Sequence, residues 1–162
     1  MLKKENEVKT TEDIVEGFEI VTEKAIELDK KQFFKMLAAA EKGLILTIER
    51  VGNTYISKFK NDKGIRPSGF FIDYSFLKDS KKYEIGISYN VGKPIAEETF
   101  KLTSGMNIIK ILSIVNPNIK KAEEVKVTKK YIEDSLTGIK FKAEIGTAYN
   151  GGFLIEPVEL LK

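Results

Sequence analysis

The hydrophobic period of the chain changes at Gly43, and this change constrains the fold more than any other feature of the sequence. Before it, the stretch 29–43 carries apolar residues at helical spacing. After it, apolar and polar residues alternate in four consecutive stretches, 44–51, 54–60, 70–76 and 83–90, as in strands with one buried face. A helix followed by a run of strands predicts an α+β, strand-rich protein.

Capping and turn residues indicate where these first elements begin and end. Asp29 and Gln32 have the spacing of a capping box at the start of the helix, and Gly43 is predicted to cap its end. The dipeptide Gly52-Asn53 predicts a two-residue hairpin between the first two strands. Nearer the N-terminus, 14–28 fits both a helix and a strand, and its period does not separate the two.

The second half of the chain returns to helical patterns before it ends in strands. After a short candidate strand at 96–102, Ser104 is predicted to cap a largely buried helix that ends at Asn116-Pro117. Thr128 is predicted to cap a short helix that ends before Gly138. The alternating stretches 139–149 and 153–161 then predict a closing hairpin.

This order of elements predicts an OB-fold-like small barrel with an N-terminal helix and a helix inserted before the last hairpin. Another α+β sheet with helices on one face is the alternative. The 162 residues suffice for one domain with a core, which we place at 13–162. Residues 1–12 are polar and unpatterned, and we expect them to form a flexible N-terminal arm.

The chain contains neither cysteine nor histidine. Disulfides, thiolate ligands and cysteine nucleophiles are therefore excluded, and the commonest general base and metal ligand are missing. The acidic pairs Glu97-Glu98, Glu123-Glu124 and Glu133-Asp134 lie among lysines, and adjacent residues do not share a helix face. We therefore expect a non-catalytic protein without a metal or other cofactor.

Two motifs of nucleotide- and DNA-binding proteins are incomplete. Five residues separate Gly86 from Gly92, and Pro94 follows Lys93, whereas a phosphate-binding loop needs four residues and a Ser or Thr. The stretch after Gly43, in the place of a helix-turn-helix recognition helix, is β-branched and apolar, which favours a strand.

Positive charge is concentrated in the middle of the chain. The net charge is −2 over residues 1–42, +4 over 43–95 and +1 over 96–162. A local excess of this kind favours an anionic partner. No apolar run reaches the ~20 residues of a membrane helix, and residues 1–13 lack the apolar centre of a secretory signal. We expect a cytoplasmic protein that binds nucleic acid and not membrane.

Aromatic and basic side chains are predicted on the outside of the strands. Because alternate residues of a strand share a face, Phe71 lies opposite the apolar residues of 70–76 and faces outward. Single-stranded nucleic acid needs cations along its phosphates and flat rings on which its bases stack. The predicted nucleic-acid-binding residues are both arginines, five lysines and two rings: Arg50, Tyr55, Lys58, Lys60, Lys63, Arg66, Phe71, Lys140 and Lys142.

Exposed lysines and an exposed ring also have a purely structural interpretation. Lysines on strands prevent aggregation between sheet edges. A single exposed Phe is ordinary, because folded surfaces are more than half apolar. The combination of rings with cations favours nucleic-acid binding over this interpretation.

The layout resembles OB-fold single-stranded DNA-binding proteins encoded by bacteriophages and conjugative plasmids of low-GC Gram-positive bacteria. The resemblance covers about residues 44–160 and is carried by the strand 68–76, the helix 103–115 and the hairpin 134–160. It implies binding to DNA during replication, recombination or transfer, in the host cytoplasm if the protein is phage-encoded. It also implies that the stacking and basic residues include Tyr55, Phe71, Lys58, Lys60 and Arg66.

The chain departs from the housekeeping bacterial members of this family in two respects. It has no tryptophan, which often supplies stacking there, and it ends in "VELLK" instead of an acidic tail. Recruitment of replication partners by such a tail is therefore in doubt.

The sequence thus predicts a non-catalytic single-stranded DNA-binding protein, and a homo-oligomer is compatible with this role. The alternative is a β-rich protein–protein interaction module, such as a phage accessory, structural or inhibitor protein. An enzyme that depends on carboxylates or lysine has no supporting constellation of residues.

Overall fold

The computed structural model describes residues 14–15, 18–19, 24–148 and 151–161. The predicted arm, 1–12, lies outside the described residues. In the ambiguous stretch 14–28, the described residues contain three short strands and no helix. β1 (Ile14–Val15) pairs with β2 (Phe18–Glu19), and β3 (Ile26–Glu27) joins the edge of the main sheet.

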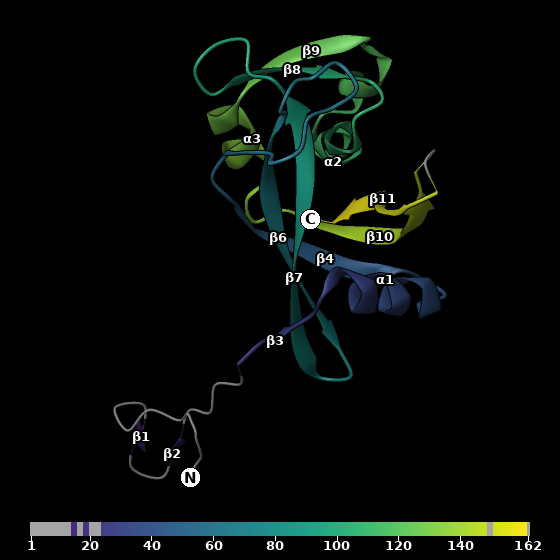
Figure 1. Ribbon diagram of the computed structural model, residues 1–162. Helices are drawn as coiled ribbons and strands as arrows, with labels where there is room; N and C mark the ends of the chain where they lie inside the picture. The colour runs from purple at the N-terminus through teal and green to yellow at the C-terminus, as the bar shows by residue number, and fades with distance from the viewer. Residues whose placement is uncertain (1–13, 16–17, 20–23, 149–150, 162) are drawn as a thin grey trace.

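A seven-stranded mixed sheet forms the body of the protein (Figure 1). Its order is β11-β10-β4-β6-β7-β3, and the short strand β5 (Tyr55–Ile56) pairs additionally with β6. β3 runs parallel to β7, and the other pairs are antiparallel. The long strands are β4 (Leu44–Val51), β6 (Ser68–Lys78), β7 (Lys81–Gly92), β10 (Lys140–Thr147) and β11 (Phe153–Leu161). This architecture confirms an α+β, strand-rich protein.

The hairpin predicted at Gly52-Asn53 is wrong. β4 and β5 do not pair with each other, because both pair with β6: Val51 lies opposite Ile72, and Tyr55 opposite Gly69. The chain does not reverse at Gly52, whose amide still donates to the carbonyl of Phe71 at 2.7 Å. The long strand β6 thus supplies partners for both segments in succession. The strand predicted at 54–60 ends at Ile56, and 57–67 form a loop.

The sheet does not close into a barrel among the described residues. The five long strands follow the order β7-β6-β4-β10-β11, and no pairing joins β7 to β11. The physical reason is α2 (Asn107–Val115), which packs against both of these strands. Lys110 of this helix lies 3.2 Å from Glu156 of β11. A buried helix therefore occupies the position that strand pairing would need to close the sheet.

The first helix, α1 (Lys30–Ala39), begins as predicted. The Asp29 carboxylate accepts from the amide of Gln32 at 2.7 Å, and the Gln32 side chain accepts from the amide of Asp29 at 3.0 Å. The predicted cap at Gly43 is wrong, since the helix ends at Ala39. Gly43 instead adopts φ +77° in the turn that leads into β4, a conformation that glycine favours.

Between β7 and β10 the chain forms a small layer of helices and a hairpin. The hairpin pairs β8 (Thr99–Thr103) with β9 (Glu124–Thr128), a strand that the sequence pattern does not indicate. α2, the 3-10 helix η2 (Pro117–Lys121) and α3 (Lys129–Leu136) complete the layer. These confirm a helical insertion before the last hairpin.

The caps of the two inserted helices differ. The Thr128 hydroxyl accepts from the amide of Tyr131 at 3.1 Å, as predicted for α3. Ser104 does not cap α2: the turn closes with the amide of Met106 donating to Thr103 at 3.0 Å, and the helix starts at Asn107. The N-cap position of α2 has no side-chain hydrogen bond.

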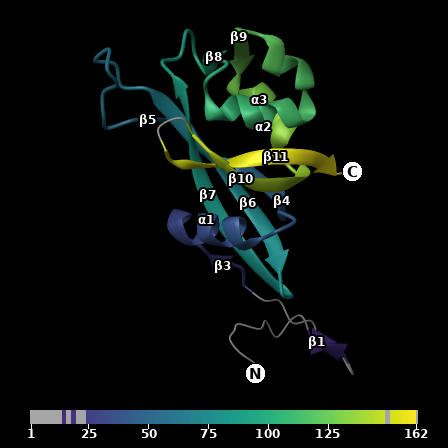
Figure 2. The ribbon, with the colours of Figure 1, turned by 90° about the vertical axis from the view of Figure 1, so that its right-hand side faces the viewer.

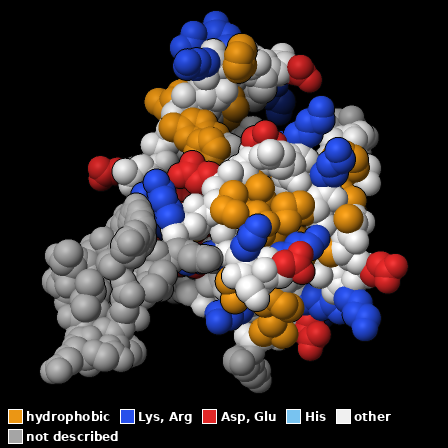
Figure 3. Space-filling model, turned by 90° about the horizontal axis from the view of Figure 1, so that it is seen from below, with side chains coloured by type: hydrophobic (Ala, Val, Ile, Leu, Met, Phe, Trp, Pro, Cys, Tyr) orange, Lys and Arg blue, Asp and Glu red, His pale blue; other side chains and the backbone are white. Residues whose placement is uncertain are grey.

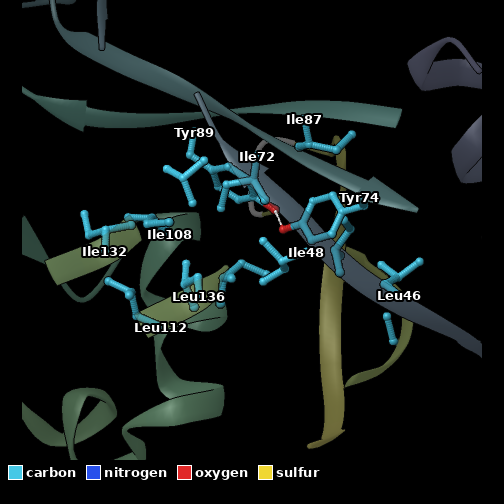
Figure 4. Close-up of a cluster of buried hydrophobic side chains, with 14 of the residues drawn as sticks. Leu46, Ile48, Ile72, Tyr74, Ile87, Tyr89, Ile108, Leu112, Ile132 and Leu136 are labelled. Atoms are coloured by element: carbon cyan, nitrogen blue, oxygen red, sulfur yellow. Dashed lines mark hydrogen bonds between the residues drawn. The ribbon is translucent and has the colours of Figure 1, made fainter. Parts of the chain in front are cut away.

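All three helices pack on the same face of the sheet. Phe33 of α1 lies 5.9 Å from Phe76 of β6, between ring centroids. Side chains of α2 and α3 meet those of β4, β6 and β7 in the buried cluster of Figure 4. Figure 2 shows α1 beside the β10–β11 hairpin. The other face of β6 carries Phe71 and Leu77, and both are exposed, which confirms the outward orientation predicted for Phe71.

In the described part of the chain, every helix is too short or too polar to cross a membrane.

Candidate nucleic-acid interface

Two aromatic rings lie side by side on the outer face of the sheet. The ring centroids of Tyr55 and Phe71 are 5.7 Å apart at an interplanar angle of 41°. The Tyr55 hydroxyl shares a hydrogen bond with the hydroxyl of Ser88, which lies on β7 directly opposite Phe71. Phe71 is 46% exposed, although it sits near the middle of the sheet. Both rings are therefore held in place while one side of each faces solvent.

Gly69 allows Tyr55 to lie flat over the sheet. A methyl group at this position would be 2.8 Å from the Tyr55 hydroxyl and 2.7 Å from the Tyr89 carbonyl oxygen. Both separations are below van der Waals contact. The absence of a side chain at Gly69 thus makes room for the ring, and β5 can pair with β6 at this point.

The loop 57–67 carries four of the predicted cations beside the rings. The amide of Ser57 donates to the Pro67 carbonyl at 2.8 Å and closes the base of the loop. The Asn61 side chain accepts from the amides of Lys63 and Ile65 at 2.9 and 3.0 Å and orders its tip. We call the basic residues of this loop the loop cations: Lys58, Lys60, Lys63 and Arg66. All four are exposed, and within the described residues none forms an ion pair.

Phe59 is the residue that sequence reasoning misses in this loop. The alternating pattern of 54–60 predicts a strand, in which its ring would alternate with Lys58 and Lys60. In the structure its ring is 80% exposed. It lies between two of the loop cations in sequence, so the loop exposes an aromatic ring as well as cations.

A hollow of about 430 Å³ lies between this loop and the start of α2. Three amide side chains, Asn61, Asn90 and Asn107, contribute to its lining together with Ser88. The side-chain oxygens of Asn61 and Asn90 accept from backbone amides, so these asparagines offer the hollow chiefly their NH2 donors. The Ser88 hydroxyl is hydrogen-bonded to Tyr55. Neither Asn90 nor Asn107 was predicted, because they come from separate elements and no sequence spacing relates them.

Arg50 has a partner on the neighbouring strand. Its guanidinium lies 2.9 Å from the Asp73 carboxylate, and Nε donates to the same oxygen at 3.0 Å. This pair lies on the outer face, one row from Phe71. The carboxylate offsets the charge that Arg50 would offer to a phosphate.

Lys140 and Lys142 lie on the same outer face but away from the rings. In β10 they are opposite Thr47 and Ile45, near the start of β4, whereas Phe71 lies beyond its end. Three acidic side chains lie on this face of β4, β6 and β7, namely Glu49, Asp73 and Glu84, which we call the acidic band. Asp73 lies in a row between Lys140 and Phe71, and Glu84 lies in the same row as Lys140. The structure therefore brings Tyr55 and Phe71 together, places the loop that carries the loop cations directly after β5, and separates the two β10 lysines from the rings.

The acidic band lines a second hollow, of about 440 Å³, together with Glu27 and Arg50. Among the residues that the structure describes, no group of acidic side chains has the arrangement of a metal site.

Comparisons of the chain with protein-family models, with curated proteins and with solved structures find no match.

Proposed function

We propose that the protein binds single-stranded DNA at the surface formed by Tyr55, Phe71 and the loop 57–67. The observation that carries the proposal is the Tyr55–Phe71 ring pair, whose centroids lie 5.7 Å apart and whose strand β5 leads directly into the loop that carries the loop cations. Bases stack on exposed rings at ~1–3 kcal/mol each, and lysine and arginine contact the phosphates between them. An arginine such as Arg66 also stacks on a base with its guanidinium plane.

The arrangement of strands also favours this surface as the DNA-binding site. We propose that β4, β6, β7, β10 and β11 form an opened relative of the OB fold, with the helical insertion between the third and fourth strands. In that fold the face of strands 2 and 3 and the loop between strands 1 and 2 bind oligonucleotides. The corresponding parts of this chain are β6, β7 and the segment 52–67, where the rings and cations lie.

The acidic band directs the path of the strand. Arg50 offsets the charge of Asp73, and Lys82 lies 3.8 Å from Glu49. The hollow lined by the acidic band therefore keeps the negative charge of Glu84 and Glu27. This charge repels phosphates and disfavours a DNA path from Phe71 down the sheet toward Lys140. The DNA instead crosses β6 and β7 near Phe71 and Ser88 and continues toward the hollow lined by Asn61, Asn90 and Asn107. This path uses unpaired bases, whose faces and Watson–Crick edges are accessible only in a single strand.

The experiment is an anisotropy titration of fluorescein-labelled oligo(dT) with the full chain at about 50 mM and about 200 mM salt. Wild-type protein should bind more weakly at the higher salt, because phosphate contacts release counterions. Phe71→Ala should weaken binding about fivefold to a hundredfold through the loss of one stacking ring.

Leu77→Ala is the matched control. Leu77 lies on the same strand and the same face as Phe71 and is 74% exposed, but the acidic band separates the two. Circular dichroism checks that both variants fold. Absence of oligo(dT) binding at low salt would refute the proposed function, and equal effects of the two substitutions would refute the proposed surface.

A further inference from the structure

A second exposed surface, on the opposite side of the core from the rings, has a different chemistry. A solvent-open hollow of about 680 Å³ lies between α1 and the β10–β11 hairpin. Its floor is apolar and is formed by Phe34, Ala38, Ile145 and Phe153. The ring centroids of Phe34 and Phe153 lie 6.0 Å apart, which fixes the helix against the hairpin.

The rim of this hollow is basic. Lys30, Lys31 and Lys35 project from α1 around the apolar floor, and none of the described residues that line it is acidic. All three lysines are exposed, and in the described ranges none of them has a carboxylate partner. On the face seen in Figure 3, hydrophobic side chains lie among Lys and Arg side chains, with Asp and Glu side chains between them.

We propose that this hollow binds an acidic segment of a partner protein that carries large apolar side chains. Carboxylates on such a segment complement the three ammonium groups. Its apolar side chains cover the floor, where the side chain of Phe153 is 57% exposed. Aromatic anchors surrounded by complementary charges are typical of sites where a few side chains supply most of the binding energy.

Two other anionic ligands fit the hollow less well. A fatty acid needs a site that encloses most of its surface, and this hollow is open to solvent. Single-stranded DNA stacks its bases on flat rings, and here the exposed Phe153 ring lies beside Ala38 and Ile145, whose aliphatic side chains suit peptide side chains better than bases. A peptide whose side chains insert into the open hollow requires neither an enclosed cavity nor flat rings on which bases stack.

The test uses the full chain and a fluorescein-labelled synthetic peptide in which Asp and Glu alternate with Phe, Leu and Ile. Anisotropy should show saturable binding that weakens with salt, and a peptide with Lys in place of the acidic residues should not bind. Phe153→Ser should weaken binding about tenfold or more. Lys35→Glu should weaken it about fivefold, whereas Lys126→Glu, on β9, should leave it unchanged.

Four outcomes would overturn the proposal. They are no saturable binding of the acidic peptide at low salt, equal binding of the Lys peptide, displacement of the peptide by sodium oleate at equimolar amounts, and unchanged peptide binding by Lys35→Glu. Lys35→Glu changes an exposed helix position, so it tests the surface even if Phe153→Ser proves unstable. Oligo(dT) binding of both variants also separates this proposal from the proposed function, since each surface can fail alone.

Discussion

The hydroxyl oxygens of Tyr74 and Tyr89 lie 2.6 Å apart in the core, on the neighbouring strands β6 and β7 (Figure 4). Each is surrounded by apolar side chains of the sheet and the helices. One hydroxyl donates to the other, so this hydrogen bond gives each of two polar groups that the fold has removed from water a partner. The two tyrosines therefore depend on each other for their burial.

Removing one hydroxyl of this pair should cost more than removing both. Tyr89→Phe leaves the Tyr74 hydroxyl buried without this partner, and we expect a loss of about 1–3 kcal/mol in the free energy of unfolding. The double variant Tyr74→Phe/Tyr89→Phe should be closer to wild type, because no polar group is then left at this point of the core. Urea unfolding of the three proteins measures this. A double variant less stable than Tyr89→Phe would contradict it.

The same pair should make the protein sensitive to alkali. Burial raises the pKa of Tyr74 and of Tyr89 above the usual value of 10.0. In the unfolded chain both groups lose their protons near pH ~10, whereas in the folded protein they keep them. Their contribution to stability is thus complete below that pH and is lost as the pH rises above it.

Urea midpoints measured between about pH 8 and about pH 11 should fall at the alkaline end. The double phenylalanine variant serves as the control, because its midpoint should fall less steeply. Absorbance of tyrosinate gives an independent measurement: two tyrosines of the folded protein should titrate only on unfolding. Titration of all six tyrosines near pH ~10 without unfolding would contradict the burial of this pair.

Two pairs of lysines should differ in their effect on DNA binding. Lys58→Gln/Lys60→Gln removes two loop cations beside the rings, and Lys140→Gln/Lys142→Gln removes the same charge beyond the acidic band. For the loop variant, the slope of log K against log salt should become shallower by about 0.7 for each phosphate that the protein no longer neutralises. The β10 variant should keep the wild-type slope. The opposite result would move the DNA path onto β10.

Releasing Arg50 from its carboxylate should strengthen DNA binding. Asp73→Asn removes one charge of the acidic band and frees a guanidinium one row from Phe71. We expect oligo(dT) affinity to rise about threefold to tenfold, while stability changes by at most ~1 kcal/mol, since the pair is exposed. Asp134→Asn, which breaks a comparable exposed pair with Lys130 on α3, is the matched control. Weaker binding by Asp73→Asn would show that the carboxylate positions Arg50 for DNA.

Several elements were predictable because their signals are local. The capping box of Asp29 and Gln32, the cap at Thr128 and the alternation that leaves Phe71 outside each depend on residues a few positions apart. The absence of a hairpin at Gly52-Asn53 was not predictable. It depends on β6, a strand further along the chain that pairs with both segments flanking this dipeptide. The open seam of the sheet depended likewise on α2, which packs between β7 and β11.

The candidate site divides in the same way. The sequence by itself determined which residues are aromatic, which are basic, and which side of β6 carries Phe71, since strand alternation follows from backbone geometry. Only the tertiary structure decided that Tyr55 lies against Phe71, that Asp73 neutralises Arg50, and that the acidic band separates Lys140 from the rings. These relationships arise from strand register and loop path, which set distances between residues far apart in the chain and are fixed by packing of the whole sheet.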